Sequence, residues 1–275
     1  MAVAGATTAR GQDAASAYED GLRHLSEGRQ EPAESAMALA VRLDPSLAAA
    51  WLARSVLTRD SARRREWYRR AFLLDPFVDL AVLQARFASA GLEQAWRDLD
   101  REVRAEAAPG LRHVPPGTLV MHLLVAARTG RLSDAIADAR ELLARDGRAG
   151  SLERNDVRLM LAVLLERTGE IDQAVRGYQD VITEDLSNFA AHGRLAAIHE
   201  RRGNLEAAVT ERRRAVAANP DDFTLRLALA STLARAGLLR EADSELSEVI
   251  RMAPWDQRAP SWQRQIRARL PSPSP

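Results

Sequence analysis

Three segments of the sequence repeat one another: GEIDQAVRGYQDVI at residues 169–182, GNLEAAVTERRRAV at residues 203–216 and GLLREADSELSEVI at residues 237–250. Each segment begins with a glycine, and successive glycines stand 34 residues apart. An alanine follows every glycine at the same distance, five positions on. Because so many positions keep one period, we infer that a single structural unit is repeated along residues 155–256.

One unit, residues 189–222, is predicted to be two helices joined by a turn. Apolar residues recur at helical spacing before Gly203 and again after it, as far as Pro220. Gly203 stands where the first helix must end in a left-handed residue, which glycine adopts without a steric penalty. Pro220 stops the second helix. Asn188 and Asp222 precede successive units and are expected to cap their first helices.

Small residues mark the places where the two helices of a unit should approach most closely, at Ala196 and Ala208. With its period, its turn glycine and its closing proline, the pattern resembles the tetratricopeptide repeat. The resemblance implies an all-α, right-handed superhelix (an α-solenoid) of about seven helix pairs and a C-terminal capping helix. The residues that carry it are Leu195, Ala196, Gly203, Asn204, Ala208, Ala215 and Pro220, together with Gly169, Ala174, Tyr178, Leu229, Ala230, Gly237, Ala242 and Pro254.

The N-terminal part, residues 14–115, is less regular and is expected to hold three further units. In the second of these, residues 58–61 replace the turn glycine, so Asp60 or Ser61 is expected to cap the next helix. An irregular connector rich in proline and glycine follows the third unit. It marks the boundary with the four regular units of residues 116–256.

Both ends of the chain differ from the repeats. Residues 257–270 are predicted to form the capping helix, because Trp262, Ile266 and Leu270 fall on one helical face. Residues 1–13 are small and polar, and residues 271–275 alternate proline with serine. Both of these segments are expected to be disordered.

The composition of the 275 residues limits the classes of protein to which the chain can belong. Basic and acidic residues nearly cancel, at 39 against 38, so no overall charge favours nucleic acid. All of the basic residues are arginine and alanine is abundant, which is typical of a GC-rich bacterial genome. There is no cysteine, which excludes disulfides and thiolate metal sites. Without a signal peptide or ~18 uninterrupted apolar residues, a cytoplasmic protein is expected.

Motifs for catalysis, cofactors and metals give no positive signal. The sequence shows no phosphate-binding glycine loop, no serine nucleophile elbow and no metalloprotease helix motif. His192 and His199 are seven positions apart, about 10.5 Å along a helix, which is too far for direct ligation of one ion. The basic runs at residues 63–70 and 212–214 are interpreted as solvated faces rather than nucleic-acid contacts. We therefore expect no enzyme, no cofactor and no metal.

The resemblance also implies a concave groove lined by the first helix of each unit. Residues ten and six positions before each turn glycine would face it, and this row is mostly apolar. Two positions before each glycine stands an arginine, which could hold a carboxylate of a bound peptide or could be a solvated helix end that complements the helix dipole. The candidate groove residues are Val120, Leu124, Arg128, Leu159, Val163, Glu166, Arg167, Gly193, Ala197, Glu200, Arg201, Leu227, Ser231 and Arg235.

These observations predict a non-catalytic scaffold that binds a peptide or helix of a partner protein in the concave groove. The bound segment is expected to carry apolar residues and an acidic end. The carboxylate clamp known in the family is not expected, because it needs lysine and the sequence has none. Two alternatives stay open: a regulator that senses a small peptide or metabolite in the groove, and an accessory subunit of an enzyme complex. The oligomeric state is also open.

Overall fold

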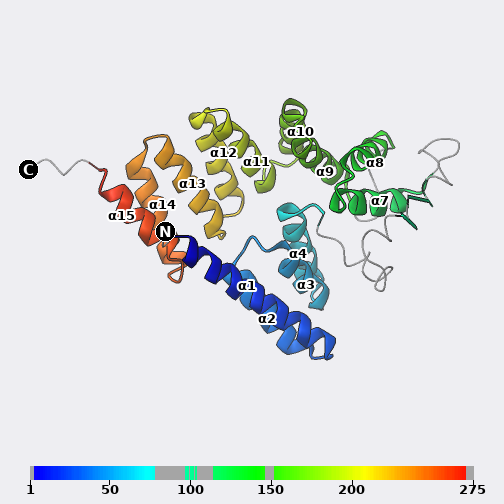
Figure 1. The fold of residues 1–275 in the computed structure, drawn as a ribbon, viewed down its shortest axis with the longest axis horizontal. Coiled ribbons are helices and arrows are strands. Elements are labelled where there is room, and N and C mark those ends of the chain that lie inside the picture. The colour runs from blue at the N-terminus through cyan, green and yellow to red at the C-terminus, as the bar shows by residue number, and fades with distance from the viewer. Residues whose placement is uncertain are drawn as a thin grey trace, which may run out of the picture. The chain divides into compact units, whose positions relative to one another are not determined.

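The structure, a computed structural model, describes residues 3–77, 97–98, 100–101, 103, 114–145 and 152–270, with the backbone alone at residues 3–13. All thirteen elements that it describes are α-helices (Figure 1), so the all-α prediction is confirmed. They are α1 (Val3–Ser26), α2 (Gln30–Leu43), α3 (Ala48–Leu57), α4 (Ser61–Leu74), α7 (Pro116–Arg128), α8 (Leu132–Ala144), α9 (Arg154–Arg167), α10 (Ile171–Glu184), α11 (Phe189–Arg201), α12 (Leu205–Ala218), α13 (Phe223–Arg235), α14 (Leu239–Met252) and α15 (Arg258–Arg267).

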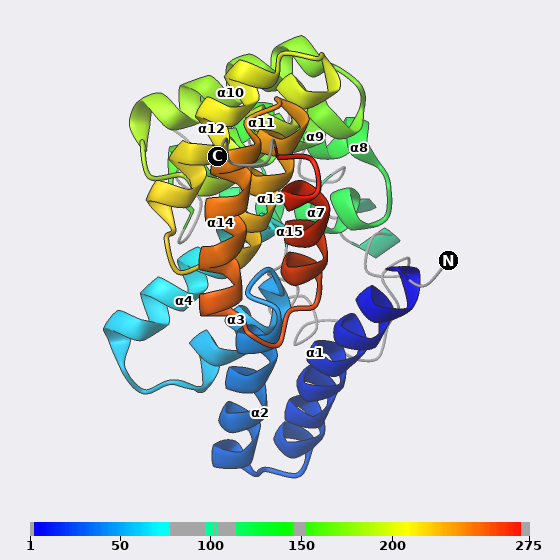
Figure 2. The same ribbon diagram turned by 90° about the vertical axis from the view of Figure 1, so that its left-hand side faces the viewer.

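The chain forms two compact units. Unit 1 combines Met1–Leu74 with Ser187–Pro275, and unit 2 is Asp75–Leu186. In unit 1, α1 packs on α2, α3 on α4, α11 on α12 and α13 on α14, and α15 packs on α14 (Figures 1 and 2). In unit 2, α7 packs on α8 and α9 on α10. Helices of consecutive pairs also touch: α8 contacts α9, and α12 contacts α13. This is the nearest-neighbour packing of an α-solenoid.

The turns and caps follow from local sequence chemistry. Gly203 has φ 77° and Gly237 has φ 81°, so the predicted left-handed helix end at Gly203 is confirmed. Asn188 caps α11 by accepting a hydrogen bond from the backbone N–H of Ala191 at 3.0 Å. Asp222 caps α13 through the N–H of Thr224 at 2.9 Å. These two predicted caps are therefore confirmed as well.

The irregular N-terminal turn also behaves as predicted. Asp60 Oδ1 accepts hydrogen bonds from the backbone N–H groups of Ala62, at 2.8 Å, and Arg63, at 3.2 Å. Asp60 is therefore the residue that caps α4, the helix that follows the turn without a glycine. The pair that should come next, the third predicted unit, lies mostly outside the described residues.

Small side chains let the helices of a pair pack closely. Ala174, Ala208 and Ala242 each have no exposed surface, and neither does Ala196. A Cβ atom on Gly177 would lie 2.9 Å from Cβ of Ala162, closer than two carbon atoms pack. The approach of α10 to α9 therefore requires glycine at that position.

The two ends of the chain differ from one another. The helix α15 packs through Ile266 and Trp262 on the apolar cluster of α13 and α14, as the cap prediction requires. Residues 271–275 lie outside the described part. At the other end α1 begins at Val3, so it overlaps the segment expected to be a disordered leader. Alanine, the strongest helix former, recurs through this segment and accounts for the longer helix.

No helix among the described residues is both long enough and apolar enough to cross a lipid bilayer.

Candidate functional site

A hollow of about 320 Å³ lies on unit 1, and we call it the α13 hollow. Four of its lining residues come from α13 and are spaced i, i+3, i+4 and i+7, so they share one face of the helix. The neighbouring helices α11, α12 and α15 supply the others. The residues that line it are Thr224, Leu227, Ala228 and Ser231 of α13, with Glu200, Arg212, Arg258 and Trp262. Three predicted groove residues, Glu200, Leu227 and Ser231, therefore come together here.

Glu200 is the electrostatic centre of the hollow. Its Oε1 accepts hydrogen bonds from Nε and Nη2 of Arg212, at 3.0 and 2.9 Å, and from the Thr232 hydroxyl, at 2.7 Å. Its Oε2 accepts one from Arg235 Nη1, at 2.9 Å. Burial opposes ionisation of Glu200, but the Thr232 hydroxyl and the two guanidinium groups outweigh it, so the pKa of Glu200 is lowered. The carboxylate is thus charged and amply supplied with donors.

The predicted arginine row makes contacts inside the protein. Arg235, at the end of α13, reaches back to Glu200 on α11. Arg167, at the end of α9, donates to the carbonyl of Ala127 on α7 at 2.9 Å. In each case the arginine joins its own helix pair to the preceding one. These two guanidinium groups therefore stabilise the stacking of pairs, a role that neither interpretation of the sequence pattern included.

The remaining arginines of the row differ from this pattern. Arg128, at the end of α7, donates to Asp75 Oδ2 at 2.7 Å and, through Nε, to the Phe77 carbonyl at 3.2 Å. Arg201 is exposed at the end of α11. Glu166 accepts a hydrogen bond from the Tyr178 hydroxyl at 2.7 Å, which links α9 to α10.

Most of the predicted apolar row belongs to the core. Leu124, Leu159, Val163 and Leu227 are all buried, and Leu159 is only 1 % exposed. Val120, Gly193, Ala197 and Ser231 are partly exposed. A bound molecule would therefore meet the small and polar members of the row rather than its large apolar members.

His192 has a carboxylate partner inside unit 1. Its Nδ1 lies 2.6 Å from Oε2 of Glu211 on α12, and both side chains are largely buried. Burial works against the charge on Glu211, but the hydrogen bond and charge of His192 prevail, so the pKa of Glu211 is lowered. In the part of the chain that the structure describes, no three His, Cys, Asp or Glu side chains are arranged to hold a metal ion.

Comparison with protein families identifies the repeated unit. Two overlapping stretches, residues 120–185 and 159–223, match the tetratricopeptide repeat model. Residues 120–223 carry tetratricopeptide repeats. The matched stretches run from α7 to α12, so they include two of the three repeated segments of the sequence, while the third, in α14, lies beyond them.

Solved structures agree on the fold of this tetratricopeptide repeat protein. A crystal structure of MamA matches with a TM-score of 0.50 and 14% identity, covering 66% of this chain and 95% of MamA. A MamA RS-1 ArsTM double mutant matches at 0.51 and 16%, with the same coverage. A chain of the Naa15/Naa10 complex bound to HypK-THB matches at 0.51 and 12%, covering 93% of this chain and 39% of that one. A comparison with curated proteins found no match. Identities this low establish the fold alone.

Several residues of the α13 hollow were missing from the sequence prediction. Thr224 and Ala228 could have been found, because they lie one helical turn from Leu227 and Ser231. Trp262 was assigned only to the apolar face of the cap, yet it is partly exposed and also lines the hollow. Arg212 belongs to a second helix of a tetratricopeptide repeat, which the groove argument left out.

Proposed function

We propose that this tetratricopeptide repeat protein is a non-catalytic scaffold that binds a peptide or helix of a partner protein along α11, α13 and α15 of unit 1. The observation that carries the proposal is the α13 hollow. The repeat fold supports interaction with another protein in general. The hollow adds a specific place, where side chains of two repeats and the cap meet at one surface.

The lining of the hollow indicates which residues a partner would carry. Ala228 and Ser231 are small and partly exposed, and Trp262 offers an aromatic side chain beside them. An apolar side chain of the partner would fit between these residues. The side chains of Arg235 and Arg258 are 50% and 41% exposed, so either could also meet an acidic group at the partner's end.

The charged groups at the hollow are suited to binding rather than to catalysis. Glu200 has a lowered pKa and accepts hydrogen bonds from three side chains. Asp256 is paired with Arg258 at 2.7 Å. A general base must be free to take a proton near neutral pH, and Glu200, with its lowered pKa and its hydrogen-bond donors, does not meet that requirement. The proposal places the scaffold in a bacterial cytoplasm, in keeping with the cysteine-free, arginine-rich composition.

The proposal predicts that Ser231→Trp abolishes partner binding while the fold is kept. Ser231 is partly exposed, so an indole there would fill the hollow without entering the core. Binding should weaken at least ~10-fold, a change of about 1.4 kcal/mol. The measurement is capture of the partner from lysate of the source cells, followed by titration of the purified partner.

The matched control is Ser244→Trp, which adds the same side chain at an exposed position of α14 outside the hollow. It should bind like the unmodified protein, and both variants should keep the helical circular dichroism. Undiminished binding by Ser231→Trp would refute the α13 hollow as the partner site. Leu159 and Leu227 are unsuitable for this test because both are buried, and a charge at either would unfold the chain.

A further inference from the structure

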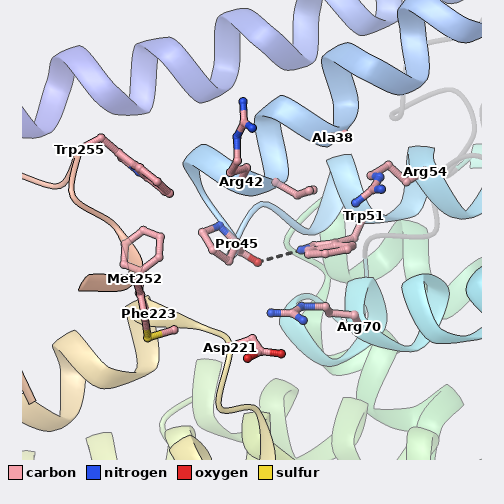
Figure 3. Close-up of a pocket in the computed structure, with 11 residues that line it drawn as sticks. Ala38, Arg42, Pro45, Trp51, Arg54, Arg70, Asp221, Phe223, Met252 and Trp255 are labelled. Atoms are coloured by element: carbon pink, nitrogen blue, oxygen red, sulfur yellow. Dashed lines mark hydrogen bonds between the residues drawn. The ribbon is translucent and has the colours of Figure 1, made fainter. Parts of the chain in front are cut away.

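A second cavity, of about 340 Å³, lies within unit 1 and shares no lining residue with the α13 hollow. Figure 3 shows its opposed walls, and we call it the arginine cleft. Helices α2, α3 and α4 form one wall, and residues in and around α13 and α14 form the other. The first wall presents Arg42, Arg54, Arg70, Trp51, Pro45, Ala38 and Val41, and the second presents Asp221, Phe223, Met252 and Trp255.

The indole of Trp51 organises the basic wall. Its Nε1 donates a hydrogen bond to the Pro45 carbonyl at 2.9 Å, the dashed line in Figure 3, which fixes the ring. The guanidinium carbons of Arg70 and Arg54 lie 4.5 and 5.5 Å from the ring centroid. Arg54 also lies 3.9 Å from the centroid of Trp67. Stacking of this kind holds a guanidinium group in place and leaves its in-plane donors for an acceptor.

The cations of this wall are incompletely paired within the protein. Arg70 has Asp222 as its acidic partner, at 3.6 Å. Arg42 and Arg54 have no carboxylate within 4 Å among the described residues. The Nε atoms of Arg54 and Arg70 are buried without a hydrogen-bond acceptor. Desolvation by burial lowers the pKa of Arg54, although the negative charges of Glu34 and Glu66 oppose this.

The opposite wall is mostly apolar. Phe223 and Trp255 form an edge-to-face pair with centroids 6.4 Å apart, and Met252 lies beside them. The indole Nε1 of Trp255 is buried without a partner. Of the residues that the structure describes, Asp221 is the only acidic one that lines the cleft, and it is exposed. Arginines and Trp51 therefore line one side of the cleft and aromatic residues the other, and the nearby carboxylates are Asp221 and Asp222, the partner of Arg70.

We propose that the arginine cleft binds an organic monocarboxylate with an apolar, aromatic body. The carboxylate would be held by Arg70, whose side chain points toward the opposite wall in Figure 3, with Arg42 and Arg54 adding positive charge around the cleft. The body would pack on Phe223, Met252 and Trp255. Asp221 disfavours a second negative charge, so a monocarboxylate fits better than a phosphate group. A cavity of this volume is at the small end of ligand sites, which suits one aromatic acid. The same chemistry could come from a free acid or from an acidic side chain next to an aromatic one in a peptide.

The test uses 3-phenylpropionate and its uncharged analogue 3-phenylpropanamide as probes of the full chain. Binding is measured by ligand-observed NMR and by tryptophan fluorescence. The acid should bind with a dissociation constant on the order of millimolar, as befits a small fragment, and about tenfold more tightly than the amide. Equal binding of acid and amide would overturn the proposal, as would equally tight binding of inorganic phosphate.

Two substitutions at exposed lining residues move the affinity in opposite directions. Arg42→Gln should weaken 3-phenylpropionate about threefold or more, and Asp221→Asn should strengthen it about threefold, because a repelling charge is removed. Arg65→Gln, at an exposed position of α4 away from the cleft, is the matched control and should change nothing. If neither Arg42→Gln nor Asp221→Asn changed the affinity for 3-phenylpropionate, the proposal would be overturned. This outcome does not depend on a substitution of the partly buried Arg54, which could prevent folding.

A third probe, N-acetyl-aspartyl-phenylalaninamide, distinguishes the two sources of the carboxylate. Tighter binding than 3-phenylpropionate would assign the cleft to a peptide, and weaker binding would assign it to a free acid. Ser231→Trp should leave every probe unaffected, because Ser231 does not line this cleft. The experiments therefore test the ligand proposed for the arginine cleft separately from the partner site proposed at the α13 hollow.

Discussion

Glu200 on α11 joins three consecutive helices through its carboxylate. It accepts hydrogen bonds from Arg212 on α12 and from both Thr232 and Arg235 on α13. Its side chain and that of Arg212 are each less than one-fifth exposed, so solvent screens this pair less than an ordinary surface pair. A single side chain at the end of α11 thus stabilises contacts within one pair and between two pairs.

Glu200→Ala should lower the free energy of unfolding by about 2 kcal/mol, because it leaves Arg212 partly buried without its acceptor. Urea unfolding followed by circular dichroism measures the change. The control is Glu241→Ala, which removes an exposed partner of Arg213 and should cost less than about 0.5 kcal/mol. Equal losses in the two variants would show that Glu200 is an ordinary surface residue.

At the scale of the helix pair, glycine has two distinct roles. Gly203 ends α11 in a left-handed conformation with φ 77°, and a Cβ there would meet no atom within 4 Å. Gly177 lies inside α10, where a Cβ would lie 2.9 Å from Cβ of Ala162 on α9. The first position is restricted by backbone conformation and the second by the distance between two helices.

Alanine substitution at three glycines separates these effects. Gly203→Ala should cost about 1 kcal/mol from backbone strain alone, and Gly177→Ala should cost about 1 to 3 kcal/mol from overpacking. Gly117→Ala, in α7 with open space around it, should be neutral or stabilising by up to ~1 kcal/mol. Thermal and urea unfolding measure all three, and a stabilising Gly177→Ala would contradict the close approach of α9 and α10.

At the scale of the whole molecule, stability depends on carboxylates that are ionised in the folded state. The pKa values of Glu200 and Glu211 are both lowered below the ordinary glutamate value of 4.5. The unfolded chain therefore binds more protons at acid pH, and the stabilisation is present above pH 4.5 and is lost as the pH falls through the lower folded values. Burial instead raises the pKa of Asp138, although its hydrogen bond to His122 opposes this, so Asp138 acts in the opposite direction.

The free energy of unfolding should consequently fall as the pH is lowered from 6 to 3.5, and Glu211→Gln should reduce this slope. Urea midpoints measured across the range give the dependence. Ser244→Ala, at an exposed position of α14, removes no titratable group; it is the control and should keep the slope of the unmodified chain. A slope that Glu211→Gln leaves unchanged would show that the His192–Glu211 pair does not contribute to acid sensitivity.

The fold could be predicted because it depends on interactions between residues close in the sequence. Most of the site could not be predicted, because it depends on contacts between distant residues. The 34-residue period, the turn at Gly203 and the caps at Asn188 and Asp222 depend on neighbours in the sequence, so they were found there. The partner of Arg167 is a backbone carbonyl in the preceding pair, at Ala127, and a regular register of arginines does not identify such an acceptor. The arginine cleft joins residues of α2 to α4 with residues near α13 and α14, and no repeat period connects those segments.

Unit 1 is assembled from both ends of the chain, Met1–Leu74 and Ser187–Pro275, with all of unit 2 between them. During synthesis on the ribosome, the first four helices emerge long before α11 to α15 exist. Unit 2 can form as soon as it is translated, whereas unit 1 can close only after α11 to α15 have been added and its two segments have been brought together across the whole of unit 2. The arginine cleft needs both parts of unit 1, so it forms only after the whole of unit 2 has been translated.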